Sequence, residues 1–361
     1  MKIAIDMQTT LGQKSGFGFY VDNLVKNIKK IDQSNQYVLI KPGTNKDLST
    51  PKRIIWDQFG FPLQANLKRV DIIHQPCFSA PIFSFAKKVV TIHDLISMNF
   101  PENIPRFSRM FYSQWMPFTY RFADHYIAIS KHTKKDILRL LKLDPSKITV
   151  IYEAADESYM PLTKKADLEK VAKVREKYKL PEKYILHIGT LEPRKNLIFL
   201  VKVFAEAIKD KKIPHSLAIA GKKGWYYEEL FKLVDDLGLA DRVIFTGYID
   251  DEDKSYLYNG SSLFAFPSVY EGFGLPPLEA MSCGVPVMTS STSSLPEVVD
   301  KAGVLLPPNN KNLWVRNMKR VLKSSKVQKE MSEASLIQAA KFSWQKTAEQ
   351  TLEVYNKLTA K

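Results

Sequence analysis

Two acidic residues eight positions apart flank a glycine-bearing loop in the segment 264–290, which reads FAFPSVYEGFGLPPLEAMSCGVPVMTS. Glu271 lies just before the two glycines, and Glu279 falls in the first turn of a short helix that we expect over 277–283. Carboxylates accept hydrogen bonds from sugar or ribose hydroxyls, and glycines let backbone N–H groups approach a ligand closely. The pattern therefore favours binding of a polyol and a phosphate, although each residue type alone is equally typical of a solvated loop.

Arg194 and Lys195 form a second candidate group, in the loop GTLEPRKN that precedes the apolar helix pattern NLIFLVKVFAEAIK. Positive side chains at a helix N-terminus are unfavourable unless something negative neutralises them. We therefore expect a phosphate ligand beside this pair, with a solvated basic turn as the alternative.

His93 and Asp94 end the apolar strand expected over 89–93. The carboxyl ends of strands are where α/β proteins tend to place catalytic groups, because ligands bind there. The position makes His93 a candidate catalytic residue, whereas a lone His such as His74 is more often structural.

A further glycine-bearing loop follows the strand expected over 2–7 and leads into an amphipathic helix. Gly16 and Gly18 supply only half of a dinucleotide fingerprint, since Val21 stands where the third glycine would be. The loop favours an approach of backbone N–H groups to a ligand phosphate rather than an NAD site.

Short apolar runs alternate with helix patterns along the whole chain, which predicts parallel, doubly wound α/β sheets. In the first half we expect strands over 2–7, 37–40, 53–56, 71–74, 89–93, 125–130 and 148–152. In the second half we expect them over 184–189, 217–220, 243–246, 263–267 and 285–290.

The length of 361 residues predicts two domains. Their expected bounds, together with those of the connecting and final segments, are 1–160 for the first domain, 161–183 for a charged linker, 184–340 for the second domain and 341–361 for a C-terminal helix.

Composition is ordinary for a folded protein, with 45% hydrophobic and 25% charged residues. No run reaches the ~20 apolar residues of a membrane span, and no signal peptide is visible, so we expect a cytoplasmic protein. The two cysteines, Cys77 and Cys283, are expected as buried thiols. The formal charge of +15 favours polyanionic partners, but no nucleic-acid motif accompanies it, so nucleic acid is not expected.

Three motifs together resemble a known family. E-G-F-G-L-P-x-L-E-A-M-x-C-G-x-P-V at 271–287 resembles the E-x7-E signature of retaining GT-B glycosyltransferases, the family 4-like or group 1 enzymes. T-x-H-D-L at 91–95 and E-P-R-K-N at 192–196 are similar to the acceptor-domain and donor-phosphate motifs of that family. The resemblance covers nearly the whole chain. It implies two Rossmann-like domains facing a central cleft, with the helix 341–361 packing back on the first domain.

The resemblance also implies a role for each candidate residue. Glu279 would bind the ribose of the donor. The diphosphate would be bound by Arg194, Lys195 and Gly16, and the transferred sugar by Glu271, Phe273, Gly274 and Leu275. His93 would contact the sugar from the opposite domain, and Glu271 would either attack it or only orient it. The family implies retention of anomeric configuration, no metal and no cofactor besides a nucleoside diphosphate sugar, such as a UDP or GDP sugar. Thr190 departs from relatives that carry an arginine there.

The function expected from the resemblance is transfer of a hexose-type sugar to a glycan or lipid-linked acceptor, in synthesis of a cell-surface polysaccharide or glycolipid. Two alternatives remain: a sugar-nucleotide epimerase or phosphorylase-like enzyme of the same fold, and a nonenzymatic protein that binds polyanions or sugars.

Residues 100–122 interleave aromatic side chains with Arg106, Arg109 and Arg121. Arginines beside aromatic rings suit an anionic membrane surface, which would make the protein peripheral on the inner face of the plasma membrane. The alternative is an ordinary helix whose aromatic residues fill the core.

Overall fold

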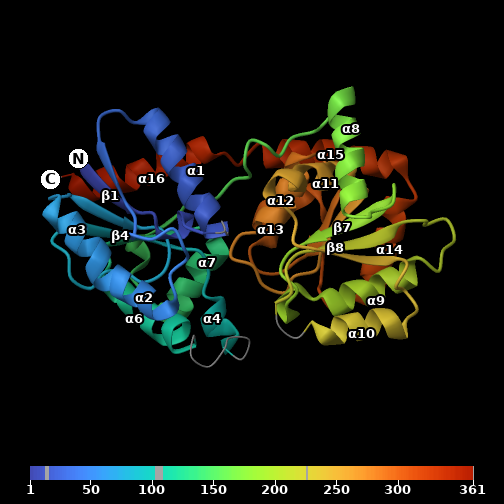
Figure 1. The fold of residues 1–361 in the computed structure, drawn as a ribbon, viewed down its shortest axis with the longest axis horizontal. Helices are drawn as coiled ribbons and strands as arrows, with labels where there is room; N and C mark the ends of the chain where they lie inside the picture. Colours follow the sequence, from blue (N-terminus) through green and yellow to red (C-terminus); the bar gives the residue numbers. More distant parts are fainter. Residues whose placement is uncertain (13–15, 102–108, 225–226, 361) are drawn as a thin grey trace. The chain divides into compact units, whose positions relative to one another are not determined.

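The computed structural model describes residues 1–12, 16–101, 109–224 and 227–360. Internal contacts divide the chain into two compact units, which are coloured along the sequence in Figure 1. Unit 1 comprises Met1–Ala154 together with Ser343–Lys361, and unit 2 comprises Ala155–Phe342.

Unit 1 contains a six-stranded parallel sheet, in the order β2-β1-β3-β4-β5-β6. Its strands are β1 (Lys2–Asp6), β2 (Gln36–Ile40), β3 (Ile72–Gln75), β4 (Lys87–Ile92), β5 (His125–Ala128) and β6 (Ile148–Val150). Every residue of β3 and β5 is buried. Parallel strands covered by helices on both faces read as continuous apolar runs, which is why most of these strands could be predicted.

Helices cover both faces of the unit 1 sheet (Figure 1). They are α1 (Gly16–Ile31), α2 (Thr50–Ile55), α3 (Phe61–Leu67), α4 (Ile96–Asn99), α6 (Met116–Thr119), α7 (Lys131–Asp136) and α16 (Trp344–Thr359). Short 3-10 or π turns are η1 (Gln8–Thr10), η2 (Trp56–Gly60), η4 (Phe111–Trp115), η5 (Tyr120–Phe122), η6 (Ile137–Leu141) and η7 (Pro145–Lys147). Helices α1 and α16 lie together on one face, and α2, α3 and α6 lie on the other.

The last helix, α16, belongs to unit 1 although it follows all of unit 2 in the chain. Tyr355 of α16 is fully buried, and its hydroxyl lies 2.6 Å from Nδ1 of His74 on β3. The second nitrogen of His74 lies 2.9 Å from Oγ1 of Thr91, so this histidine is a structural residue between two strands and α16.

The strand expected over 53–56 is wrong, because these residues belong to α2 and η2. Pro51 at the start of α2 suits the first turn of a helix, where its missing N–H has no intrahelical partner. The short run Ile54–Trp56 has no periodicity of its own, so sequence alone could not separate a strand from a helix there.

Unit 2 also contains a six-stranded parallel sheet, in the order β12-β11-β10-β7-β8-β9. Its strands are β7 (Tyr184–Ile188), β8 (Ser216–Ala220), β9 (Val243–Gly247), β10 (Leu263–Phe266), β11 (Val287–Ser290) and β12 (Val304–Leu306). The sequence did not predict β12, which is only three residues long. Strand order reverses between β7 and β10, the position where open α/β sheets bind ligands.

The helices of unit 2 are α8 (Lys165–Lys177), α9 (Leu197–Ala207), α10 (Glu228–Asp236), α11 (Asp251–Gly260), α12 (Leu275–Ser282), α13 (Leu295–Val299), α14 (Lys311–Leu322) and α15 (Ser325–Ala339). Two 3-10 turns, η8 (Pro193–Lys195) and η9 (Asp300–Ala302), accompany them.

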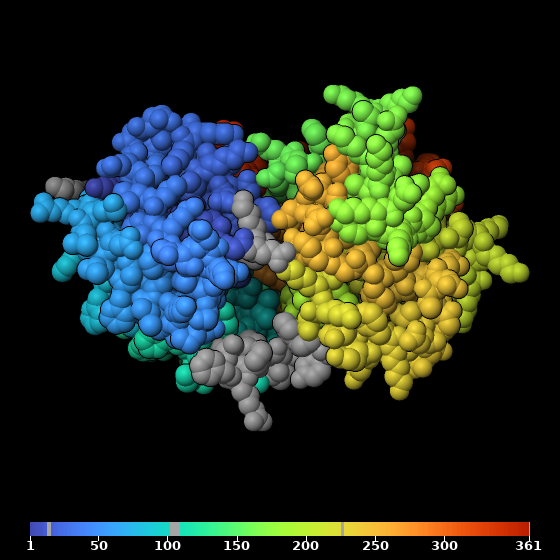
Figure 2. Space-filling model, viewed as in Figure 1, coloured from blue at the N-terminus to red at the C-terminus, as the bar shows by residue number. Residues whose placement is uncertain are grey.

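The charged segment 161–183, expected as a linker, forms α8 instead and packs on α11. Lys177 Nζ lies 2.6 Å and the Tyr178 hydroxyl 2.8 Å from Oδ2 of Asp253. Figure 2 shows α8, in light green, at the surface of unit 2. Because most of its side chains face solvent, the composition of α8 is that of a linker although its backbone is helical.

Several local predictions are confirmed. Ser130 caps α7 by accepting a hydrogen bond from the N–H of Thr133, and Gly284, with φ of +73°, ends the helix before β11. Helix α12 runs over Leu275–Ser282, slightly earlier than expected. Cys77 and Cys283 are buried free thiols. Within the described part of the chain, no helix has the length and apolar character needed to cross a membrane.

Candidate active site

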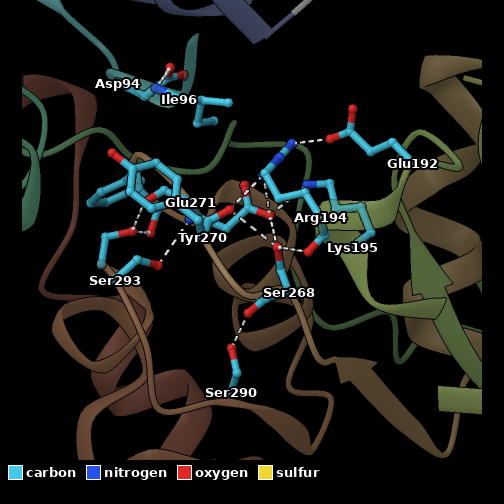
Figure 3. Close-up of polar contacts among 12 residues, drawn as sticks. Asp94, Ile96, Glu192, Arg194, Lys195, Ser268, Tyr270, Glu271, Ser290 and Ser293 are labelled. Carbon is cyan, nitrogen blue, oxygen red and sulfur yellow. Dashed lines mark hydrogen bonds and ion pairs between the residues drawn. The ribbon is translucent and has the colours of Figure 1, made fainter. Parts of the chain in front are cut away.

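The reversal of strand order in unit 2 brings two loops together at the carboxyl ends of neighbouring strands. The loop 189–196 follows β7 and the loop 267–274 follows β10, and these strands pair directly. The carbonyl of Arg194 joins the loops: it accepts a hydrogen bond of 3.0 Å from the N–H of Val269, and the hydroxyl oxygen of Ser268 lies 3.2 Å from it. Arg194, Lys195 and Glu271, predicted for the phosphate and the sugar, therefore lie in one small region (Figure 3).

Three predicted residues are in direct contact there. Lys195 Nζ donates to Oε1 of Glu271 over 2.6 Å, and Nη1 of Arg194 lies 2.8 Å from the same oxygen. Arg194 also pairs with Glu192 through Nη2. Figure 3 shows Arg194, Lys195 and Ser268 directed at the carboxylate of Glu271.

The electrostatics of the cluster hold Glu271 in its charged form. Burial raises the pKa of this carboxyl, but Arg194 and Lys195 outweigh burial and lower the pKa to about 2. Glu271 is therefore an ionised hydrogen-bond acceptor at neutral pH and has no proton to donate as a general acid.

This pairing changes the argument for a phosphate ligand. We expected the positive pair to need a phosphate for neutralisation, but Glu271 and Glu192 already supply negative charge beside it. Acidic side chains of the protein itself therefore offset the unfavourable interaction of these two cations with the N-terminus of α9. The phosphate assignment of Arg194 and Lys195 stays a prediction from the family resemblance.

Hydroxyl groups hold the loop that carries Glu271. Ser268 donates to Oε1 of Glu271 over 2.6 Å, and Ser293 accepts from the N–H of Glu271 over 2.9 Å. Ser294, which is fully buried, donates to the carbonyls of Glu271 and Phe273, and Ser290 donates to the carbonyl of Ser268. Three of these serines belong to the cluster SSTSS at 290–294, at the end of β11 and in the loop that follows it.

An aromatic layer lies next to the charged cluster. The Lys195 Nζ lies 4.9 Å from the centre of the Phe266 ring, and the His187 ring stacks on Phe266 with centroids 5.3 Å apart. Burial lowers the pKa of His187 to about 4, so this ring is neutral at neutral pH. His187 and Phe266 were not predicted, because an apolar strand does not reveal which of its residues support a site.

The other residues predicted for the sugar form the start of α12. Phe273 is buried, and Gly274 precedes Leu275, the first residue of the helix. Gly274 has φ of +120°, and a Cβ there would come within 3.0 Å of the Leu295 side chain. The tight approach of loop and helix therefore requires glycine at this position.

Glu279 is hydrogen-bonded to a residue outside the charged cluster. Its Oε2 accepts a hydrogen bond of 2.7 Å from the hydroxyl of Tyr258 on α11. Burial raises the pKa of Glu279, while the nearby Lys254 and Tyr258 oppose that shift. The surroundings of the two predicted carboxylates therefore differ. Cations contact Glu271 and lower its pKa, whereas Glu279 accepts a hydrogen bond from a tyrosine and has a raised pKa.

In unit 1, His93 is buried with both ring nitrogens in contact with acceptors. Nδ1 lies 2.9 Å from Oε1 of Glu153, and Nε2 lies 2.8 Å from the carbonyl of Pro76. The rings of Phe17 and Tyr20 pack edge-on against it, with centroids 4.8 and 4.7 Å away. A sugar hydroxyl could reach a ring nitrogen of His93 only by displacing one of these acceptors. Sequence analysis did not identify Glu153.

Gly16 begins α1, next to the Phe17 that packs on His93. A Cβ at Gly16 would meet no described atom within 4 Å, so folding of the described residues does not demand glycine there. Gly16 and His93 thus lie near one another in unit 1.

The carboxyl ends of β1 and β3 carry a buried polar cluster that the sequence did not reveal. Gln8 donates through Nε2 to Asp6 over 2.6 Å and to Asp57 over 2.7 Å, and Gln75 bridges the same two carboxyls at 2.8 and 3.3 Å. Burial raises the pKa of Asp6 to about 6, and burial with the nearby Asp6 raises that of Asp57 to about 8. This cluster lies where strand order reverses in unit 1.

Residues 170–360 match the family described as Glycosyl transferases group 1, and residues 29–159 match Glycosyltransferase Family 4. The chain belongs to the group 1 glycosyltransferases. The family expected from the three sequence motifs is thereby confirmed.

Known relatives of this group 1 glycosyltransferase include O-antigen chain mannosyltransferase B of Escherichia coli, with 33% identity over 80% of this chain and 74% of that protein. Serotype-specific mannosyltransferase WbdA of Escherichia coli is 31% identical over 75% of this chain, which spans only 34% of WbdA.

Solved structures show the same fold. The group 1 glycosyltransferase aligns with sucrose-phosphate synthase from Thermosynechococcus elongatus at a TM-score of 0.77 and 20% identity, covering 99% of this chain and 98% of that one. It aligns with Anabaena Alr3699/HepE in complex with UDP and glucose at a TM-score of 0.74 and 18% identity, covering 99% and 100%. The expected GT-B fold, with two parallel α/β sheets, is confirmed.

Proposed function

We propose that the protein is a retaining, metal-independent hexosyltransferase that transfers a sugar from a nucleoside diphosphate donor to a glycan or lipid-linked acceptor. The cluster of Arg194, Lys195 and Glu271 at the strand reversal of unit 2 is the observation that supports a donor site most strongly. The likeness to two bacterial mannosyltransferases supports mannose as the hexose and a cell-surface polysaccharide as the product.

In the proposed site, Arg194 and Lys195 bind the donor diphosphate, and Glu279 binds the ribose hydroxyls. Breaking the anomeric bond places negative charge on the departing diphosphate. Fixed cations stabilise that charge more in the transition state than in the ground state, and a rigid support makes the stabilisation larger. The contacts of both cations to Glu271 and the loop give them that rigidity.

Glu271, with the backbone at Phe273, Gly274 and Leu275, is proposed to hold the transferred sugar. Its low pKa supports this role, because an ionised carboxylate accepts hydrogen bonds from sugar hydroxyls across the neutral range. His93 and Gly16 are proposed to complete the donor contacts from unit 1. The interaction of His93 with Glu153 fixes the orientation of its ring for that purpose.

The test is a thermal-shift panel of UDP, GDP, ADP and their sugars, followed by product analysis with the labelled donor that binds. We expect one nucleoside diphosphate to raise the melting temperature, and its sugar to yield a glycosylated acceptor in the presence of EDTA, with the anomeric configuration of the donor.

The other outcomes point to different functions. Release of an altered nucleotide sugar without a glycosylated acceptor would favour an epimerase, and a sugar phosphate product would favour a phosphorylase-like enzyme. Failure of every nucleotide to raise the melting temperature would favour a nonenzymatic binding protein. Activity that disappears with EDTA would contradict metal independence alone.

A further inference from the structure

The helical stretch 50–67 of unit 1, formed by α2, η2 and α3, turns apolar side chains to solvent. Four of them are 60–75% exposed and are spaced four residues apart: Ile55, Phe59, Leu63 and Leu67. The same stretch turns two polar residues inward, since Asp57 and Gln58 are buried. Trp56, Phe61 and Ala65 supply the apolar side of the stretch that packs on the core, so packing of unit 1 does not explain the exposed apolar side.

A spacing of four residues keeps these side chains on one stripe because the helix changes its winding. On an α-helix of 3.6 residues per turn, positions four apart drift steadily around the axis. The π turn η2 (Trp56–Gly60) winds more widely and counters the drift in the middle of the stretch. The four apolar side chains therefore run along one side of the helix. In Figure 2 this stretch, in lighter blue, lies uncovered at the surface of unit 1.

Two further exposed aromatic side chains, Phe83 and Phe85, lie in the loop before β4. They are 80% and 100% exposed, which no ordinary core requirement accounts for. The loop is fastened to the helix on both sides of Phe83: the N–H of Ile82 donates to Oε1 of Gln58 over 3.1 Å, and the Ser84 hydroxyl lies 3.4 Å from Oδ1 of Asn66. We call Ile55, Phe59, Leu63, Leu67, Phe83 and Phe85 the unit 1 apolar surface.

Phe118 and Phe122 lie on the other side of the same loop, with ring centroids 5.6 Å apart. Their segment is joined to the loop and to β4 by two hydrogen bonds: Ala80 N–H to Thr119 Oγ1 over 3.0 Å and Lys88 N–H to Asp124 Oδ2 over 2.9 Å. Both phenylalanines are exposed, at 45% and 37%.

Cations border the unit 1 apolar surface. Exposed basic side chains lie at both ends of the helical stretch and near the loop: Lys52, Lys68, Arg69 and Arg121. Lys87 is also exposed, but its Nζ is paired with Asp124. Asp57 is the sole acidic residue of the segments 50–69 and 81–88, and it is buried. The border therefore carries a positive charge next to apolar side chains.

We propose that the unit 1 apolar surface inserts into the headgroup region of an anionic lipid bilayer, with the bordering cations on the lipid phosphates. Contiguous exposed apolar patches with a polar rim mark interaction sites, and apolar side chains beside lysines and arginines suit the membrane interface. The inference goes beyond the proposed sugar transfer, because it rests on this surface and not on the donor site.

Charge complementarity favours lipid over a second copy of this chain. A symmetric dimer through this surface would place the same patch on itself, so the positive borders would face each other and repel. Anionic head groups instead attract each basic side chain near the surface.

The surface differs from the one expected from the sequence. None of the six residues of the unit 1 apolar surface belongs to the predicted membrane segment 100–122. Phe118, Arg121 and Phe122 of that segment are exposed, whereas Phe111 and Tyr120 are buried in the core. Of the arginines predicted to meet lipid there, Arg106 lies outside the described residues.

The test is flotation of the full chain with vesicles of equal parts phosphatidylcholine and phosphatidylglycerol, beside vesicles of phosphatidylcholine alone. We expect the protein to float with the anionic vesicles. The double variant Phe83→Ser/Phe85→Ser should bind them at least about tenfold more weakly, because two apolar rings no longer leave water. The variant Lys68→Gln/Arg69→Gln should lose about fivefold for each cation removed.

Ile337→Ser is the matched control, because Ile337 on α15 is 69% exposed but lies in unit 2. It should float like the wild type, and all variants should keep the wild-type melting temperature and their transfer to a water-soluble acceptor. Absence of wild-type flotation on anionic vesicles, or undiminished flotation of Phe83→Ser/Phe85→Ser, would overturn the proposal. A dimer in sedimentation that this double variant dissociates, without vesicle binding, would assign the surface to self-association instead.

Discussion

The strand reversals of the two sheets both gather polar side chains, but of opposite kinds. Between β7 and β10 in unit 2, Glu271 meets two cations, and its pKa is lowered to about 2. Between β1 and β3 in unit 1, Asp6 and Asp57 are bridged by amides, and the pKa of Asp57 is raised to about 8. The strand reversals of two similar sheets thus lower the pKa of one carboxyl and raise that of another.

Strand topology therefore determines where a polar cluster forms, and the side chains at that place determine the charge of the cluster. The unit 2 cluster has cationic groups that suit a diphosphate. The unit 1 cluster is fully buried, with Asp57 and Gln75 inaccessible to solvent, and its hydrogen bonds tie the loop after β1 to η2 and the loop after β3. We interpret it as a support for unit 1 rather than a second binding site.

The largest expected effect tests whether the unit 2 cations serve catalysis. Lys195→Ala should slow transfer about 10²- to 10³-fold at saturating donor, because one fixed cation no longer stabilises the leaving diphosphate. The far-ultraviolet circular dichroism should not change. Lys209→Ala is the control, since Lys209 is an exposed lysine paired with Glu206 on the same unit. Turnover of Lys195→Ala close to that of the control would contradict the phosphate assignment.

The second largest expected effect is the loss of stability when Glu271 is replaced. Glu271→Gln leaves two partly buried cations without their shared carboxylate, which should lower the free energy of unfolding by about 3 kcal/mol at neutral pH. Because the pKa of Glu271 falls from 4.5 to about 2 in the folded protein, this stabilisation is complete above 4.5 and is lost as the pH falls toward 2.

Urea denaturation of wild type and variant at neutral pH and at about pH 3 measures this effect. The difference in free energy of unfolding between wild type and Glu271→Gln should be smaller at about pH 3 than at neutral pH. Glu192→Gln is the matched control, since the ion pair of Glu192 is to Arg194 and it should cost less. A gap that stays the same at both pH values would show that charge pairing is not the cause.

The unit 1 cluster should give the opposite pH dependence. The pKa of Asp57 rises from 3.8 to about 8 on folding, so the folded state keeps a proton that the unfolded state loses. The resulting stability is complete below 3.8 and is lost as the pH rises through about 8. Asp57→Asn removes this titration, and its melting temperature should fall less than that of the wild type between about pH 5 and pH 8.

The exposed Asp47 offers a control, because Asp47→Asn should leave the wild-type pH dependence intact. Parallel melting curves for wild type and Asp57→Asn across this range would mean that Asp57 is ionised in the folded protein, and the contrast between the two units would fail.

The smallest effect concerns the hydroxyls that hold the Glu271 loop. Ser293→Ala should cost about 1 kcal/mol, since the N–H of Glu271 loses one hydrogen bond. Ser294→Ala should cost about 2 kcal/mol, because two buried carbonyls lose their shared donor. Chemical denaturation compares the two, and a larger loss for Ser293→Ala would contradict this order.

The sequence predicted the position of the site better than its internal contacts. Arg194, Lys195 and Glu271 were each expected at the carboxyl end of a strand, and the structure places them there. The bond between Lys195 and Glu271 joins residues 76 positions apart. It depends on the pairing of β7 with β10, and no local pattern encodes strand order.

The failures have a similar cause. The stretch around Ile55 was expected as a strand, because the short apolar run 54–56 taken alone does not distinguish a strand from a helix. Asp57 was therefore not recognised as the partner of Asp6. The segment 161–183 was expected as a linker, since the many charges of α8 hide the contacts of Lys177 and Tyr178 with Asp253.

The return of α16 to unit 1 has a consequence for biosynthesis. Residues 155–342 must all be translated before the segment that completes unit 1 begins, which takes roughly 10 to 40 s at about 5–20 residues per second. During that interval Tyr355 has not been synthesised, so its packing position beside His74 in unit 1 is unfilled. Unit 1 therefore cannot complete its fold until all of unit 2 has been synthesised, although unit 1 begins at the N-terminus.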